Sequence, residues 1–184
     1  KVLGFRGENT ATLASELRVL GDASNSGSFR AYELRIDRFR PGIVITEINE
    51  NIPPPIRFVV KFDPGFHLRY HFYGYSIAAL EDLCAKHDYG ILELEYNNAF
   101  LAPRESGAEF TNASTAYRKG YWERPERKDR FASNLDMEEL HTLDPERAMQ
   151  FLRIFYSAEE GNYFLAADSA TLESELADTS LAVK

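Results

Sequence analysis

The hydrophobic and polar positions of the chain follow two different periodicities, which predict a series of helices and strands. Leu13, Leu17 and Leu20 recur at helical spacing over residues 10–20, and a second apolar stripe over residues 29–39 ends at "RPG". Residues 42–48, "GIVITEI", form instead a continuous run rich in β-branched residues. Such a run is typical of a strand that is covered on both faces, as in parallel sheets.

The clearest local signals follow this strand. Residues 49–75 are rich in proline, aromatic residues and glycine, with one short strand expected in "IRFVVKF". Ser76 is a favourable N-cap for a helix over "IAALEDLCAKH". The apolar stripe of this helix consists of Ile77, Leu80, Leu83, Cys84 and His87. Two apolar segments then flank Asn97-Asn98, which predicts a tight antiparallel hairpin because asparagine tolerates positive φ.

The C-terminal third of the chain is predicted to be mainly helical. Asp136 and Glu139 have the spacing of a capping box, which predicts a short helix. Asp144 and Pro145 predict the start of a helix over "ERAMQFLRIFY". The last residues, 169–184, are acidic and weakly patterned and are expected to form a flexible tail. We therefore expect one domain over residues 1–168, with a core at 29–103 and a helical extension at 104–168.

The order of these elements predicts an α/β fold. A buried strand, a helix and a second strand make a βαβ unit, and the hairpin adds an antiparallel strand to it. The expected architecture is a partial Rossmann-like parallel sheet closed by an antiparallel C-terminal β-hairpin, with helices at the C-terminal end.

The stretch "EINENIPPP", residues 47–55, contains the best candidate for chemistry. Open α/β sheets bind ligands at the carboxyl ends of their strands, where Glu47 and Asn49 are predicted to lie. There Glu47 or Asn49 would orient a substrate hydroxyl, and the Glu47 carboxylate would accept its proton. The alternative is that Glu47 pairs with an arginine and Asn49 caps the loop.

A second candidate is the start of the predicted helix at Ser76. Tyr73, Tyr75 and Ser76 lie at a helix N-terminus, whose free amide groups suit an anionic or hydroxylated ligand. The alternative is an ordinary N-cap with aromatic packing. His67, His71 and Asp63 suggest a metal site, but "FDPGFHLRYHF" follows a proline-glycine turn and is expected to be extended, so no metal site is predicted.

Composition and charge narrow the class of partner. The formal net charge of -8 argues against a nucleic-acid partner, which requires a basic face. No apolar run approaches the ~20 residues of a membrane span. Cys84 is the only cysteine, which favours a reducing, cytoplasmic compartment, and no secretory signal pattern is found near Lys1. A small molecule or a protein is therefore the expected partner.

Three ordered segments carry a family resemblance. "RPGIVITEIN", "PPPIRFVVKFDP" and "HFYGYSIAALEDLCAKHDYGILELEYNNAFLAP" resemble the C-terminal portion of FkbM-like class I S-adenosylmethionine-dependent methyltransferases. In that group a strand ending in Glu-x-Asn leads to an aromatic-Gly-x-Ser helix start, and then to a hairpin with an asparagine turn followed by Ala-Phe. The resemblance covers about residues 29–156.

The resemblance implies S-adenosylmethionine as cofactor, but the cofactor-binding residues of this chain are unknown. The family's glycine-rich turn and its acidic strand end, which hold the cofactor, have no counterpart in the sequence. The expected function is therefore a fragment or divergent form of a methyltransferase that acts on a small-molecule or sugar hydroxyl. The alternative is a non-catalytic α/β binding module that associates through an uncovered sheet edge.

Overall fold

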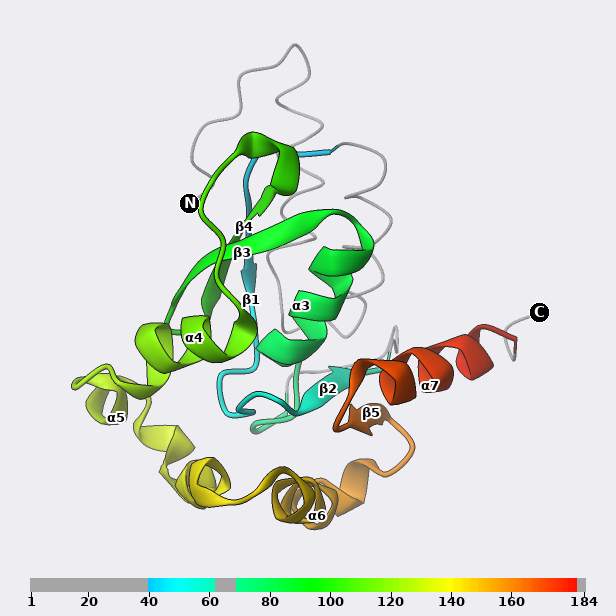
Figure 1. Cartoon of the computed structure of the whole chain (residues 1–184). Coiled ribbons are helices and arrows are strands. Elements are labelled where there is room, and N and C mark those ends of the chain that lie inside the picture. Colours follow the sequence, from blue (N-terminus) through cyan, green and yellow to red (C-terminus); the bar gives the residue numbers. More distant parts are fainter. Residues whose placement is uncertain (1–39, 62–68, 182–184) are drawn as a thin grey trace.

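The computed structural model describes residues 40–61 and 69–181 of the chain. The helices expected over residues 10–20 and 29–39 lie outside these ranges, as do Asp63 and His67. Within them the fold is α/β, with two antiparallel sheets and several helices (Figure 1).

The larger sheet, sheet A, contains β1 (Val44–Glu47), β4 (Asn98–Pro103) and β3 (Tyr89–Glu95) in that order. β4 pairs antiparallel with both neighbours, so β1 and β3 run in the same direction with β4 between them. The run "GIVITEI" predicted a parallel strand buried on both faces, but its partner among the described residues is antiparallel. Its burial also alternates, with Val44 and Thr46 buried and Ile45 and Glu47 half-buried, because the described helices cover one face only.

The predicted hairpin is confirmed, with a small difference at its turn. Glu95 pairs with Asn98, so the two turn residues are Tyr96 and Asn97. Positive φ falls on Tyr96, at 57°, rather than on an asparagine. Tertiary contacts hold this conformation: the Tyr96 N–H donates to the Gly120 carbonyl at 2.9 Å, and the Arg130 guanidinium lies 4.1 Å from the centre of the tyrosine ring.

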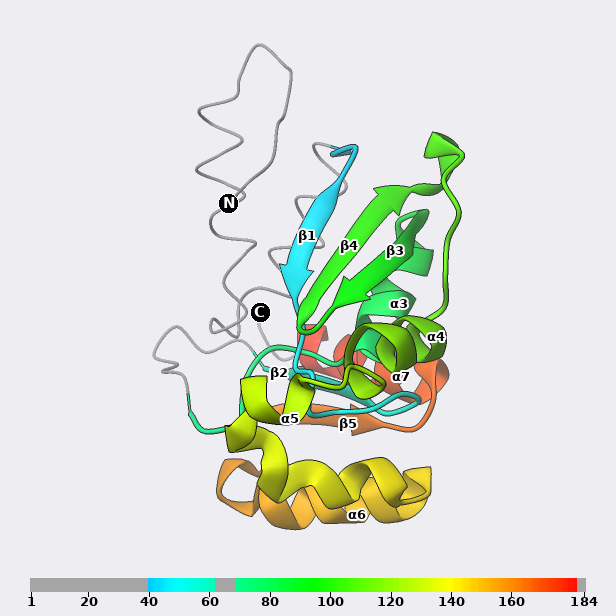
Figure 2. The same ribbon diagram turned by 90° about the vertical axis from the view of Figure 1, so that its left-hand side faces the viewer.

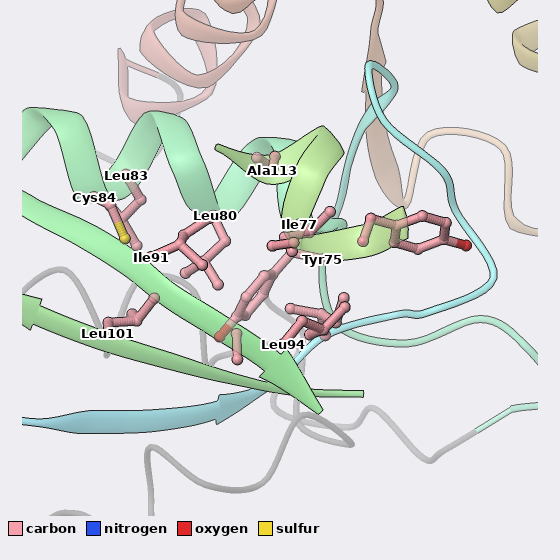
Figure 3. Close-up of a cluster of buried hydrophobic side chains, with 14 of the residues drawn as sticks. Tyr75, Ile77, Leu80, Leu83, Cys84, Ile91, Leu94, Leu101 and Ala113 are labelled. Carbon is pink, nitrogen blue, oxygen red and sulfur yellow. The ribbon is translucent and has the colours of Figure 1, made fainter. Parts of the chain in front are cut away.

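Helix α3 (Ile77–Lys86) covers one face of sheet A and begins at Ser76, as predicted. The Ser76 side chain accepts the Ala79 N–H at 3.3 Å, which satisfies one of the free amides of the first turn. The apolar stripe of α3 is buried against β3 and β4, and Figure 3 shows Leu80 and Leu83 facing Ile91 and Leu101.

A second sheet, sheet B, pairs β2 (Arg57–Val60) with β5 (Tyr163–Ala166). The sequence predicted β2 but not β5. Sheet B separates two hydrophobic cores. Val59, Phe164 and Ala166 belong to the core beneath sheet A, whereas Phe58, Val60 and Leu165 belong to a core covered by α6 (Pro145–Phe155).

Short helical segments connect the sheets. They are α4 (Ala113–Tyr117), a π-helical turn (Arg118–Trp122), α5 (Arg127–Arg130), a 3-10 helix (Ala132–Thr142), and single 3-10 turns at Arg104–Ser106 and Ser157–Glu159. Asp144 caps α6 as predicted, accepting the Arg147 N–H at 2.9 Å. The capping box expected at Asp136 is not formed, because Asp136 lies inside the 3-10 helix.

The acidic C-terminal segment is helical where a flexible tail was expected. Helix α7 spans Ser169–Leu181, and Leu172 is buried in the core beneath sheet A. Figure 1 shows α7 beside β5, at the edge of the second sheet. Two buried or half-buried leucines, Leu172 and Leu176, are sufficient to dock a helix whose sequence has little periodicity. None of the helices in residues 40–61 and 69–181 has the length and apolar character needed to cross a membrane.

The arrangement of the layers decides what surrounds the strand ends. β1 and β3 both point toward the layer that contains sheet B, α5 and α6 (Figure 2). The carboxyl ends of these strands, where the sequence predicted an open crevice, are therefore covered by the helical extension.

Candidate functional site

Glu47 is the last residue of β1, as predicted, and is half-buried. In the register of sheet A it lies opposite Asn98, and its side chain leaves the face opposite to that of Thr46. Its charge contributes to raising the pKa of Tyr75, after burial, which is the main cause. Glu47 therefore remains at the strand end, at a position that solvent reaches in part.

Asn49 is completely buried and holds the loop that precedes α3. Its Nδ2 amide donates to the carbonyls of His71, at 2.9 Å, and Tyr73, at 3.1 Å. Its Oδ1 accepts the Asn51 N–H at 3.2 Å. Both amide protons are thus committed to the backbone, which supports the interpretation that Asn49 caps the loop.

Tyr75 and Ser76 are also fully buried and have structural partners. The Ser76 Oγ accepts the Phe58 N–H at 3.1 Å and donates to the Ile56 carbonyl at 2.8 Å, which joins α3 to β2. The Tyr75 hydroxyl bonds Thr46 of β1, and Figure 3 shows the ring between α3 and sheet A. This geometry supports the N-cap and packing interpretation of these two residues.

Tyr73 bonds instead to Glu50, a residue that was not among the candidates predicted from the sequence. Glu50 is 3% exposed. Its Oε2 accepts the Tyr73 hydroxyl at 2.9 Å, and its Oε1 accepts the Asn134 amide at 2.8 Å. Burial, followed by the nearby Glu50 charge, raises the Tyr73 pKa far above its usual value, so the phenol stays protonated and serves as a donor.

Three further tyrosines surround Glu50. The Tyr117 hydroxyl donates to the Glu50 carbonyl at 2.5 Å, and the Tyr121 hydroxyl accepts from Asn134 at 3.2 Å. Burial raises the pKa of Tyr117, Tyr121 and Tyr156, and the Glu50 carboxylate adds to each rise. Among the described residues, the carboxylate is bonded to neutral donors only, which is an expensive arrangement in a protein interior.

His71 joins this network to the surface. Its ring is 3% exposed, and Nε2 lies 2.9 Å from the half-exposed Asp136 carboxylate. Nδ1 lies 3.3 Å from Asn51 Nδ2, which can only donate, so Nδ1 is the acceptor and Nε2 carries the proton. The part of the chain that the structure describes contains no cluster of three or more histidine, cysteine or acidic side chains able to hold a metal ion. Cys84 is buried, which raises its thiol pKa to about 12.

A half-buried histidine of the 3-10 helix, His141, lies beside the π-helical turn. Its Nδ1 lies 3.4 Å from the Tyr117 hydroxyl, and its ring centre lies 4.4 Å from that of Trp122. Burial, and then the Arg127 cation, lowers the His141 pKa to about 4. Arg127 is itself held by Glu138, at 2.9 and 2.5 Å, and these bonds lower the Glu138 pKa to about 2.

A close backbone contact fixes the π-helical turn on sheet A. A Cβ atom at Gly120 would lie 2.0 Å from the Leu94 carbonyl oxygen, so only glycine fits there. This contact sets where Tyr121 and Trp122 project, and π-helical turns are often found at functional sites.

The site that emerges combines predicted and unpredicted residues. Glu50 belongs to the stretch "EINEN", so its place near the end of β1 was predictable from the sequence. Asn134 and His141 lie in a 3-10 helix whose sequence has no apolar periodicity, so neither its position nor its contacts were predictable. No family model, no curated protein and no solved structure matched this chain. The site is therefore interpreted from its own chemistry.

Proposed function

We propose that this chain is a fragment or divergent form of an S-adenosylmethionine-dependent methyltransferase that acts on a small-molecule or sugar hydroxyl. The observation that carries the proposal is the order of sheet A. β1 and β3 run in one direction, α3 lies between them in the chain, and antiparallel β4 lies between them in the sheet. An antiparallel hairpin that closes a larger, Rossmann-like parallel sheet would have this arrangement.

The edge of β1 that faces away from β4 supports the same interpretation. Within residues 40–61 and 69–181, β1 pairs with β4 alone. A parallel strand of a larger sheet would add to that edge and bring its own carboxyl end beside Glu47. S-adenosylmethionine would bind at this edge, in a cytoplasmic enzyme, through residues other than those that the structure describes.

The described residues then have distinct roles. Glu47, half-buried at the strand end, would orient the acceptor hydroxyl or accept its proton. Asn49, Tyr75 and Ser76 would act as positioning residues, because their polar groups fix the loop and α3. Methyl transfer of this kind depends mainly on holding the acceptor oxygen in line with the sulfonium carbon.

The test begins with the coding DNA upstream of Lys1. We expect an encoded strand, a glycine-rich turn and a helix, followed by an acidic strand end. The product of the complete coding sequence should bind S-adenosylhomocysteine at a 1:1 ratio in calorimetry, whereas the present chain should bind it poorly. A complete product that folds but gives no heat of binding would refute the proposal.

A non-catalytic binding module is the second candidate, and the buried polar groups favour it. Asn49, Glu50 and Ser76 form their hydrogen bonds inside the protein, so these three polar side chains are not available to a ligand. Such a module would associate through the edge of β1. Light scattering after size exclusion separates the candidates, since a monomer across a range of concentrations argues against self-association through that edge.

A further inference from the structure

The described helices that pack on sheet A cover only one of its faces. α3, α4 and the π-helical turn all contribute to the same core, which also contains Val44 and its strand partner Leu101. Side chains of directly opposed residues on antiparallel strands point to the same face, and neighbours along a strand alternate. Ile45 and its partner Phe100 therefore point to the other face of sheet A.

This second face is apolar over β1 and β4 and acidic at one end. Ile45 and Phe100 are half-buried, and Ile43, which precedes β1, is 54% exposed. Glu93 of β3 pairs with Phe100, and Glu95 is two residues further along, so both exposed carboxylates lie on the same face. A segment that covers this face needs an apolar side and a positive charge at one end.

The chain enters β1 from a fixed point, Arg40. The Arg40 guanidinium bonds the Glu105 carboxylate, at 2.7 and 3.0 Å, and lies 4.8 Å from the centre of the Tyr89 ring. The φ of Arg40 is 42°, and Pro41 follows it. A residue with positive φ, followed by a proline, is a common ending of a helix. The local geometry at Arg40 thus agrees with the helix that the sequence predicts directly before it.

Residues 29–39, which precede the described part of the chain, have the pattern and the length to cover the second face. Their apolar stripe consists of Phe29, Tyr32, Ile36 and Phe39. As a helix, residues 29–39 would be about 16 Å long, which is also about the length of an extended segment over residues 43–47. The stripe therefore matches β1 from end to end.

Direction and charge agree with this placement. A helix that ends beside the amino end of β1 and lies along the strand runs antiparallel to it, so it begins at the carboxyl end of β1. Glu95 lies level with Glu47 at that end, because both pair with Asn98. The first turn of the helix would contain Arg30 and the positive end of the helix dipole, both of which are favourable beside Glu95.

We propose that the second face of sheet A is the docking surface for residues 29–39 of the same chain, with Ile36 over Ile45 and Phe100. The inference does not depend on the proposed function, because it concerns a face of sheet A and not the strand ends. Sheet A then becomes the middle of three layers, with α3 on its other side. Another copy of the chain is left with the edge of β1 and not with this face.

The experiment is chemical cross-linking in the full chain. Ile36→Cys with Phe100→Cys places one thiol on each side of the proposed contact. Arg38→Cys with Phe100→Cys is the matched control, because positions 36 and 38 lie on opposite sides of a helix. A bis-maleimide shorter than a helix diameter, about 10 Å, should link the first pair within one chain at least about tenfold faster than the control pair. Cys84 is buried and does not compete.

Hydrogen exchange of the unsubstituted chain is the second measurement, because it needs no substitution that disturbs folding. The amides of residues 33–39 should exchange at least about tenfold more slowly in the chain than in a synthetic peptide of residues 29–39. Equal exchange rates, no link in the first pair, or equal linking of both pairs would overturn the proposal. Links between two chains only would also overturn it and would assign the face to a second copy. If the cysteine variants do not fold, the exchange rates alone decide.

Discussion

The low pKa of His141 makes a quantitative prediction for stability. In the folded chain the pKa is about 4, against 6.5 for an ordinary histidine. Between these values the unfolded chain binds the proton and the folded chain does not, so protonation favours unfolding. The depressed pKa therefore contributes stability that is present above pH ~6.5 and lost as the pH falls toward ~4.

Replacing His141 by glutamine removes this contribution. From pH ~7 to pH ~5, the linkage relation predicts that protonation of His141 lowers the free energy of unfolding of the wild type by about 2 kcal/mol. All other titrating groups contribute the same change to the wild type and to the variant. His141→Gln should therefore lose about 2 kcal/mol less stability over this interval than the wild type does. Glutamine places a side-chain amide of similar length at this position. Only the change in the free energy of unfolding between the two pH values is compared, so a loss of stability that is equal at both does not affect the result.

The assay is urea unfolding followed by Trp122 fluorescence at both pH values. Equal slopes m in the two proteins would show that the comparison concerns stability and not the extent of unfolding. Parallel pH dependences of the free energy of unfolding would refute the reasoning, because they would mean that His141 titrates alike in the folded and unfolded chains.

Three further substitutions test the packing of the site by thermal or urea unfolding, each against a matched control. Gly120→Ala should cost about 2 kcal/mol or more, because its Cβ would lie 2.0 Å from the Leu94 oxygen, whereas Gly42→Ala, with no atom within 4 Å, should change stability by less than about 0.5 kcal/mol. Leu80→Ala, at a fully buried position, should cost about 2–5 kcal/mol, while Ile154→Ala, at a position 68% exposed, should be almost neutral; equal losses would contradict the assignment of the core. Ser76→Ala removes both the cap of α3 and the acceptor of the Phe58 N–H, and should lower the free energy of unfolding by about 2–3 kcal/mol. Its control, Asp144→Ala, removes only an exposed helix cap and should cost about 1 kcal/mol. Similar losses in the two variants would show that the Ser76 bonds to β2 contribute little.

Elements set by local chemistry were predictable from the sequence. Ser76 and Asp144 cap their helices because a side-chain oxygen within the same turn satisfies free amides, and the tight hairpin forms between two apolar segments. Even there, positive φ at Tyr96 was not predictable, since the Gly120 carbonyl and Arg130 that hold it are distant in sequence.

Elements set by distant partners were not predictable. The strand Tyr163–Ala166 is too short to show a period, and it forms because Arg57–Val60 offers it an edge. Glu47 lies at the end of β1, as predicted. No local pattern indicates that a 3-10 helix covers the next residues of the loop, where Asn134 donates to Glu50 across 84 residues of sequence. Asn134 and His141 are polar residues in an aperiodic segment, and only the folded chain reveals what they contact.

The pairing of β2 with β5 has a consequence for how the protein is made. Arg57 aligns with Ala166, so the register of this two-stranded sheet encloses more than a hundred residues of chain. Such a contact has a high loop-closure cost and forms late. During synthesis, the ribosome must therefore deliver the helical extension and then β5 before β2 finds its partner. Until both the helical extension and β5 have been made, Phe58 and Val60 lack part of the layer that buries them, and exposed apolar side chains of this kind favour aggregation of a nascent chain.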